Sequence, residues 1–95
     1  NSVDNFILKQ NYPNPFNPST KISWQSPVGS WQTLIIYDIL GNEVVRLLDE
    51  YKAAGNYEIE FNVAQISNLV LTSGIYFYRL KAEDYLQTKK MILLK

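Results

Sequence analysis

Residues 56–62 have the sequence NYEIEFN, the most regular alternation of apolar and polar residues in the chain. In an extended chain, Tyr57, Ile59 and Phe61 fall on one side, and the polar residues between them fall on the other. A two-residue period over this length indicates a β-strand with one buried and one exposed face. The pattern therefore predicts a half-buried strand here, with its three apolar side chains in the core.

Six further runs on both sides of this strand have strand-like composition. They cover residues 6–10, 20–25, 31–38, 43–48, 75–82 and 86–95. Pro, Gly or Asn marks most of the turns between them. The alternation is broken in residues 43–48, where a bulge or strong twist would place Val44 and Leu47 on one face. Seven short strands at this spacing are typical of an antiparallel β-sandwich.

Two connections are less regular than the strands. Residues 49–55 have the composition of a polar connection, and residues 63–73 form either one helical turn or a packed loop. The apolar residues of this second connection include Ala64, Ile66, Leu69 and Val70. Two sheets packed face to face are expected to bury eight large side chains. These are Trp24, Ile35, Tyr37, Ile59, Phe61, Tyr76, Tyr78 and Met91.

Residues 11–18, with the sequence NYPNPFNP, contain three of the four prolines of the chain. Each proline fixes its own φ angle and disfavours a helical conformation of the preceding residue. A helix and a central strand are therefore both excluded here. Tyr12 and Phe16 are unusually large apolar groups for a disordered linker. We expect both rings to pack on the end of the core, while Asn14 and Asn17 hydrogen-bond to the local backbone.

Length and charge limit the domain content and the partners. The chain has 95 residues, and nine Lys plus Arg balance nine Asp plus Glu. This length predicts one domain over residues 1–95, with residues 1–5 as a linker remnant of a longer protein. The balanced charge argues against nucleic acid, which needs a concentrated basic face. No apolar run approaches the ~20 residues of a transmembrane helix.

The chain contains neither cysteine nor histidine, which limits its chemistry. Disulfides, thiol chemistry and Cys-ligated zinc are excluded, and the commonest general base is absent. Carboxylates at predicted turns usually serve backbone hydrogen bonding and solubility. Such acidic residues are Asp38, Asp49, Glu50, Glu83 and Asp84. Their spacing does not match a calcium loop. The sequence therefore predicts no enzymatic activity, no cofactor and no metal site.

Trp24 and Trp31 raise the alternative of carbohydrate binding, because aromatic rings can stack on sugars. Trp24 alternates with polar neighbours and is therefore expected in the core. Trp31 starts a strand after a turn and is the better candidate for exposure, although covering the end of the core is the simpler explanation. The sequence gives no second aromatic residue that must lie beside Trp31. We therefore expect no useful affinity for soluble polysaccharides.

Four segments of the chain carry a family pattern when they are taken together. They are FILKQNYPNPFNPST (residues 6–20), IYDILGNEV (36–44), SGIYFYRL (73–80) and KKMILLK (89–95). In this order they resemble the C-terminal sorting domain of type IX secretion substrates. The resemblance covers nearly the whole chain. The departure from the family pattern is residues 62–72, which are longer and more apolar than the family has before its Ser-Gly.

The resemblance implies an immunoglobulin-like antiparallel β-sandwich of about seven strands at the C-terminus of a larger exported protein. It implies a non-enzymatic signal that directs a passenger across the outer membrane of a Gram-negative, Bacteroidetes-type bacterium, for release or anchoring at the cell surface. The implied partners are the outer-membrane export machinery and a surface sortase. We expect a monomer. The alternative is a carbohydrate-binding or spacer accessory module of a secreted hydrolase.

The last run of the sequence supplies the candidate recognition residues. They are Lys89, Lys90, Met91, Ile92, Leu93, Leu94 and Lys95. A strand packed on one face needs only alternate apolar residues, yet residues 91–94 are apolar on both faces. Either both faces are covered within the fold, or a receptor binds one face and the flanking lysines; the resemblance favours the receptor. Such a receptor could pair with the backbone edge for affinity and use side chains for selectivity.

Overall fold

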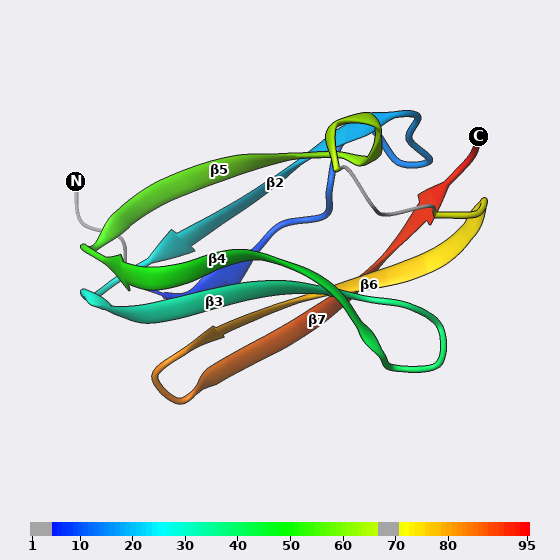
Figure 1. Ribbon diagram of the computed structural model, residues 1–95. Coiled ribbons are helices and arrows are strands. Elements are labelled where there is room, and N and C mark those ends of the chain that lie inside the picture. Colours follow the sequence, from blue (N-terminus) through cyan, green and yellow to red (C-terminus); the bar gives the residue numbers. More distant parts are fainter. Residues whose placement is uncertain (1–4, 67–70) are drawn as a thin grey trace.

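The computed structural model describes residues 5–66 and 71–95, and these form two antiparallel sheets packed as a sandwich (Figure 1). The sheet orders are β1-β2-β5 and β4-β3-β6-β7. The expected all-β, immunoglobulin-like sandwich of about seven strands is confirmed. The strands are β1 (Ile7–Leu8), β2 (Ser19–Ser26), β3 (Ser30–Tyr37), β4 (Glu43–Lys52), β5 (Gly55–Asn62), β6 (Gly74–Ala82) and β7 (Tyr85–Leu93), and a 3-10 turn η1 (Val63–Gln65) follows β5.

The alternating pattern of β5 pairs it with β2 as the sequence predicts. Ile22 lies opposite Ile59, and Trp24 lies opposite Tyr57. The rings of Trp24 and Tyr57 contact each other with their centroids 5.7 Å apart. Charged and polar residues between these pairs face solvent, so this sheet has one apolar and one polar face.

The core face of β3 differs from the prediction. Leu34 and Ile36 point into the core and are fully buried. Ile35 and Tyr37 were expected there, but they lie on the outer face, where Arg79 covers the Tyr37 ring at 5.0 Å. Ile35 is 8% exposed and is therefore shielded on that outer face. Because β3 is apolar at consecutive positions, its sequence did not reveal which set faces inward.

The remaining predicted core residues behave as expected. Ile59 is only partly buried, but it packs against the core. The fully or nearly fully buried members are Trp24, Phe61, Tyr76, Tyr78 and Met91. Apolar residues from both sheets therefore form one continuous cluster between the layers.

A buried polar network joins the two sheets within this core. Trp24 Nε1 donates a hydrogen bond to Gln32 Oε1 at 2.9 Å. Gln32 Nε2 in turn donates to Ser26 Oγ at 2.8 Å and to Ser30 Oγ at 3.4 Å. Because every member has a partner, burial of the Gln32 amide does not leave a costly unsatisfied group.

Strand β4 is longer and more irregular than its neighbours. Its pairing with β3 shifts register at two places, and Val44 and Leu47 both pack against the core, which confirms the expected bulge. The prediction of a polar connection over residues 49–55 is wrong in its first part, because β4 continues to Lys52. Residues 49, 50 and 52 are polar because they lie on an exposed edge strand rather than in a loop.

The connection between β5 and β6 begins with the turn η1. Asn62 Oδ1 caps this turn by accepting a hydrogen bond from Ala64 N at 2.9 Å. Leu71 returns to the core, whereas Leu69 and Val70 lie outside the described residues, as do residues 1–4 of the predicted linker. Within residues 5–66 and 71–95, η1 is the whole helical content, and nothing in it could span a bilayer.

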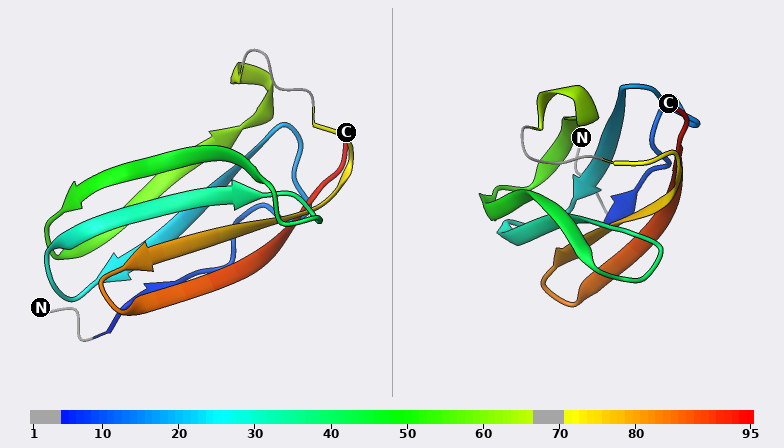
Figure 2. Two further views of the ribbon diagram at one scale, coloured as in Figure 1. Left: turned by 60° about the horizontal axis from the view of Figure 1, so that its bottom comes forward. Right: turned by 45° about the vertical axis from the view of Figure 1, so that its right-hand side comes forward.

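The two ends of the sandwich carry different segments. The β2–β3, β4–β5 and β6–β7 turns gather at one end (Figures 1 and 2). Residues 11–18, η1 and the end of β7 gather at the opposite end. The candidate recognition strand therefore finishes beside the segment that contains the three clustered prolines.

Candidate recognition surface

The seven predicted recognition residues divide between the core and the surface. Met91 and Leu93 are fully buried, and they lie opposite Tyr76 and Gly74 of β6. The partly buried members are Lys89 and Ile92, and the exposed members are Lys90, Leu94 and Lys95. Side chains of β7 that could meet a receptor are therefore those on its outer face and at its end.

Residues 11–18 cover the backbone edge of β7. Ile92 N donates to the Asn14 side-chain oxygen at 2.9 Å, and Ile92 O accepts from Phe16 N at 2.9 Å. Leu94 N donates to Phe16 O at 3.0 Å, so Phe16 pairs in parallel with Leu93. The last residues of β7 therefore present no free backbone edge to a receptor in this structure, because residues of the chain itself occupy the edge.

Gln10 extends this cover toward the middle of β7. Its Nε2 atom donates to Lys90 O at 2.7 Å and to Asn11 Oδ1 at 2.7 Å. The Gln10 side chain therefore links the edge of β7 to the residues that precede the proline segment. Side chains and backbone from several positions therefore cover the edge of β7. A partner that adds a strand at this edge would have to replace several hydrogen bonds rather than one.

The buried Tyr78 hydroxyl fixes the chain just before the proline segment. It donates to Lys9 O at 2.7 Å and accepts from Asn11 N at 2.8 Å. Burial raises the pKa of Tyr78 to about 12, although the hydrogen bond from Asn11 acts in the opposite direction. The neutral phenol is thus held between two backbone groups that belong to a segment far away in sequence.

Asn11 and Thr20 fix the first turn of the proline segment. Asn11 Nδ2 donates to Thr20 Oγ1 at 2.9 Å and to Pro13 O at 3.1 Å, while Thr20 Oγ1 donates to Pro13 O at 2.7 Å. The segment is therefore ordered, as expected. Phe16 is buried as predicted, but the prediction for Tyr12 is wrong, because its side chain is 80% exposed. The backbone of Tyr12 forms two hydrogen bonds with Lys21.

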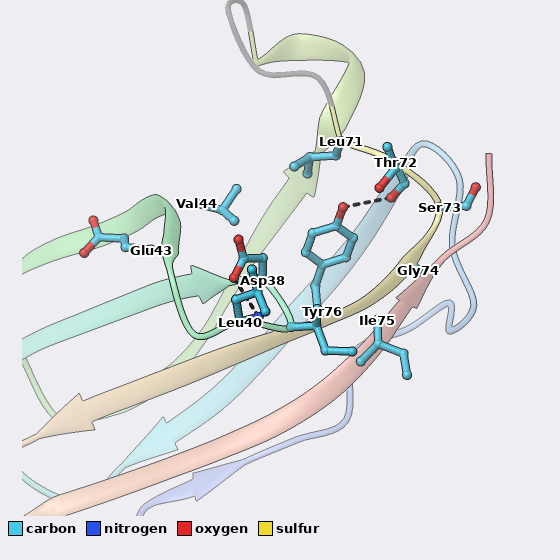
Figure 3. A pocket seen from close by; sticks show the side chains of 11 residues that line it. Asp38, Leu40, Glu43, Val44, Leu71, Thr72, Ser73, Gly74, Ile75 and Tyr76 are labelled. Carbon is cyan, nitrogen blue, oxygen red and sulfur yellow. Dashed lines mark hydrogen bonds between the residues drawn. The ribbon is translucent and has the colours of Figure 1, made fainter.

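A pocket of about 640 Å³ opens at the same end of the sandwich (Figure 3). The β3–β4 loop and the segment that enters β6 line it, through residues 38–40, 43–44 and 71–76. The Tyr76 hydroxyl donates to Thr72 O at 2.8 Å and holds its ring at the pocket wall. Ser73 Oγ accepts a hydrogen bond from Lys95 N at 2.8 Å, and this bond places the Lys95 backbone at the pocket rim.

The β3–β4 loop presents apolar side chains at this rim. Asp38 Oδ1 accepts hydrogen bonds from Leu40 N at 3.0 Å and Asn42 N at 2.9 Å. Gly41 adopts a φ of 87°, which a residue with a side chain rarely does. The ordered loop leaves Ile39 and Leu40 exposed, and Leu40 is 83% exposed. Ile39 and Leu40 therefore form a small exposed apolar patch at the tip of this hydrogen-bonded loop.

The carboxylates beside the pocket already have structural partners. Asp38 is engaged by its own loop, and Glu43 forms an ion pair with Arg46 at 3.1 Å. At this end of the sandwich, Leu40 and Leu94 are exposed apolar side chains, and Lys95 is an exposed cation.

Comparison with known proteins gives one family and one fold. The sequence model of a family described as secretion system C-terminal sorting domain matches residues 10–94. No curated protein matches the sequence. The crystal structure of dimeric latent PorU from Porphyromonas gingivalis is similar, with a TM-score of 0.69 and 22% sequence identity. The likeness covers 94% of this chain but 9% of that PorU chain, and it shows a shared fold.

Proposed function

This chain belongs to the family of type IX secretion system C-terminal sorting domains, and on that premise we propose that it directs a larger passenger protein across the outer membrane. The passenger would be released or anchored at the cell surface of a Bacteroidetes-type bacterium. The observation that carries this proposal is the family match over residues 10–94. The domain itself acts by being recognised and not by catalysing a reaction.

The export machinery would recognise the end of the sandwich at which β7 finishes. Leu94 and Lys95 are exposed there, Lys90 is exposed further back along β7, and Leu40 is exposed on the β3–β4 loop. The hydrogen bonds from residues 11–18 to Ile92 and Leu94 fix the backbone from which Leu94 and Lys95 project. A preformed surface loses little conformational entropy on binding, so a small number of contacts is sufficient for selection.

Recognition would use side chains rather than an added strand. The edge of β7 is already engaged at Lys90 O, at both backbone groups of Ile92 and at Leu94 N. A receptor that adds a strand at this place must first displace the proline segment. Apolar anchoring through Leu94 and Leu40, with lysine charges at the rim, requires no such rearrangement.

The expected monomer is consistent with the charged and bulged edge strand of the larger sheet. Strand β4 is the last strand on that side, and its exposed residues include Glu43, Arg46, Asp49 and Glu50. Charged and bulged edge strands resist pairing with another copy of the chain. A single copy would therefore be presented to the export machinery, and a surface sortase would act on the passenger–domain connection.

An export assay tests this proposal. Residues 1–95 are fused to the C-terminus of a reporter that carries a periplasmic signal, in a host with type IX secretion. We expect the reporter outside the cell with this fusion and in the periplasm without the domain. A fusion that stays in the periplasm, although the domain is folded, overturns the sorting function.

Two matched variants then locate the recognition surface. Leu94 and Leu86 lie toward opposite ends of the C-terminal strand region and are 54% and 56% exposed. Leu94→Ser should strongly reduce export with little change in melting temperature, whereas Leu86→Ser should be exported normally. Normal export of both variants would show that the surface around Leu94 is not the one recognised.

A further inference from the structure

Two exposed aromatic residues lie at paired positions of neighbouring strands on the outer face of the four-stranded sheet. Trp31 of β3 lies directly opposite Tyr51 of β4. Each of these side chains is 61% exposed. Residues opposite each other in antiparallel strands have Cβ atoms about 4.5–5.5 Å apart. The sequence did not reveal this pair, because residues 49–55 were expected to form a connection rather than to continue β4. The expectation of no affinity for polysaccharides rested on the lack of a second aromatic residue beside Trp31, and Tyr51 removes that ground.

The two rings extend in opposite directions from this common row. Trp31 Nε1 donates to Asp49 Oδ1 at 2.6 Å, so the indole reaches across toward the residue two positions before Tyr51. The Tyr51 ring reaches the backbone of Gly29, two positions before Trp31, and would collide with any side chain there. Because β3 and β4 are antiparallel, these two directions diverge. The rings therefore form an elongated aromatic strip rather than a stacked pair.

The Trp31 ring is held in place by a chain of polar contacts. Asp49 binds the indole N–H and also Arg46, whose guanidinium lies 3.0 Å from the Asp49 carboxylate and 3.1 Å from Glu43. The indole hydrogen bond, followed by that of Arg46, lowers the pKa of Asp49, so this carboxylate stays ionised in mild acid. Since the only polar atom of the indole is engaged, the ring face is what remains for a ligand.

We propose that Trp31 and Tyr51 form a platform that binds a neutral oligosaccharide. The faces of aromatic rings carry negative charge density, and the C–H groups on the face of a pyranose ring are weakly positive, so the two surfaces stack favourably. Two divergent rings offer places for successive sugar rings of one chain. Asp49 and Arg46 lie at the edge of the platform, where they can exchange hydrogen bonds with sugar hydroxyls.

The charges around the platform largely offset one another, which favours a neutral ligand over an anionic one. Arg46 is neutralised by Glu43 and Asp49, and Lys52 lies 3.2 Å from Glu50. These five groups carry two positive and three negative charges, and their net charge of −1 does not attract an anionic glycan.

The same charges argue against a protein partner on this platform. The centre of a protein interface is depleted of charged residues and extends over about 800 Å² per partner. Here exposed charged residues of β4 border the two rings directly. The platform also lies at the end where β3 starts and β4 finishes, opposite the proposed recognition surface, so both could be occupied at once (Figure 1).

The test uses the purified domain and neutral soluble polysaccharides of several backbones: hydroxyethylcellulose, xylan, galactomannan and glycol chitin, with polygalacturonate as an anionic comparison. Migration in native gels that contain each polysaccharide is measured and converted to affinity. At least one neutral polysaccharide should retard the wild-type domain, and polygalacturonate should not. Trp31→Ala and Tyr51→Ala should each weaken retardation by about tenfold. Tyr12→Ala, which removes an exposed tyrosine elsewhere, should leave it unchanged.

Gly29→Ala provides a second test that leaves both aromatic rings in the chain. The new methyl group must displace the Tyr51 ring, so affinity should fall while the melting temperature stays within a few degrees of the wild type. The proposal is overturned if no neutral polysaccharide retards the domain, or if retardation is unaffected by Trp31→Ala. It is also overturned if sedimentation shows that the wild-type domain self-associates, that Trp31→Ala abolishes this self-association, and that added sugar does not change it.

Discussion

The two edges of the four-stranded sheet are protected in different ways. Strand β7 has two fully buried apolar residues near its end, and residues 11–18 occupy its backbone edge there. Strand β4 has charged residues along its length and two shifts in register. An exposed strand edge invites pairing with another chain, and natural proteins prevent this by cover, charge or bulges. This one sheet uses cover at β7 and charge with bulges at β4.

The difference determines which surfaces remain available for function. At β7, the cover removes the backbone from contact and leaves only exposed side chains such as Lys90 and Leu94. At β4, the ion pairs of Arg46 hold Asp49, and Asp49 holds the Trp31 indole. The covered edge therefore favours recognition through side chains at its end, while the charged edge favours an ordered aromatic surface on the sheet face beside it.

The largest effect on stability is expected when residues 11–18, which cover the edge of β7, lose the buried ring of Phe16. Phe16 is buried and packs on Phe61 with ring centroids 5.9 Å apart. Phe16→Ala should lower the free energy of unfolding by about 3–5 kcal/mol, as is typical for a buried phenylalanine. Urea unfolding measures the loss, and amide exchange at Ile92 and Leu94 should accelerate as the cover loosens.

The same segment supplies the control for this change. Tyr12→Ala alters an 80% exposed side chain only four residues away and should change the free energy of unfolding by no more than about 0.5 kcal/mol. If Phe16→Ala were as mild as Tyr12→Ala, the segment would be a loose tether and the two edges would not differ as described.

A smaller loss of stability is expected when the buried Tyr78 hydroxyl, which binds the backbone just before the proline segment, is removed. Tyr78→Phe leaves Lys9 O and Asn11 N without their buried partner. The free energy of unfolding should fall by about 1–3 kcal/mol, the cost of leaving such groups unsatisfied. Melting curves for Tyr78→Phe and for the exposed-site control Tyr12→Phe measure the difference, and equal stability would show that the hydroxyl does not hold the segment.

The same hydroxyl should also make stability depend on pH in the alkaline range. The pKa of Tyr78 is raised from 10.0 to about 12 by burial, so the folded state holds the proton more tightly than the unfolded state. This contribution is complete below pH 10 and is lost as the pH rises toward 12. Urea midpoints should therefore fall more steeply over this range in the wild type than in Tyr78→Phe. Parallel curves would contradict the assignment.

Much of the fold followed from local patterns because alternate burial leaves a direct trace in sequence. The regular alternation in residues 56–62 placed Phe61 in the core, and the broken alternation of residues 43–48 indicated the bulges of β4. Where a strand is apolar at successive positions, as at Ile35 and Tyr37, the sequence did not identify the inward face. On the outer face, Arg79 of β6 lies over the Tyr37 ring, and Arg46 of β4 pairs with Ile35.

The candidate site was harder to predict because its contacts join distant residues. The hydrogen bond from Ile92 N to Asn14 spans 78 positions, and no local pattern indicates it. An asparagine between two prolines suggested a local backbone contact, whereas the actual partner is the edge of β7. Trp31 was identified as the better candidate for exposure, but Tyr51 was missed because the charged residues around it resemble those of a loop.

A small effect on stability is expected at the charged edge. Arg46→Ala removes two ion pairs, but both lie at the surface, where such pairs contribute little. The melting temperature should fall less than in Tyr78→Phe, and the difference should shrink at high salt because ions screen exposed pairs. Thermal unfolding at low and high salt measures this. A large, salt-independent loss would show that β4 depends on packing by Arg46 rather than on charge.

The smallest effect on stability is expected from the two lysines at the covered edge, and there folding separates from function. Lys90 and Lys95 are exposed, so Lys90→Ala with Lys95→Ala should change the free energy of unfolding by no more than about 0.5 kcal/mol. If an acidic receptor surface binds them, loss of both charges should slow encounter and reduce export of a fused reporter.

A matched double variant, Lys21→Ala with Lys81→Ala, removes the same charge from other exposed positions and should be exported normally. Normal export of the Lys90 and Lys95 variant would leave apolar contact around Leu94 as the remaining basis for recognition. Equal loss in both double variants would mean that export responds to the net charge of the domain and not to the lysines at the end of β7.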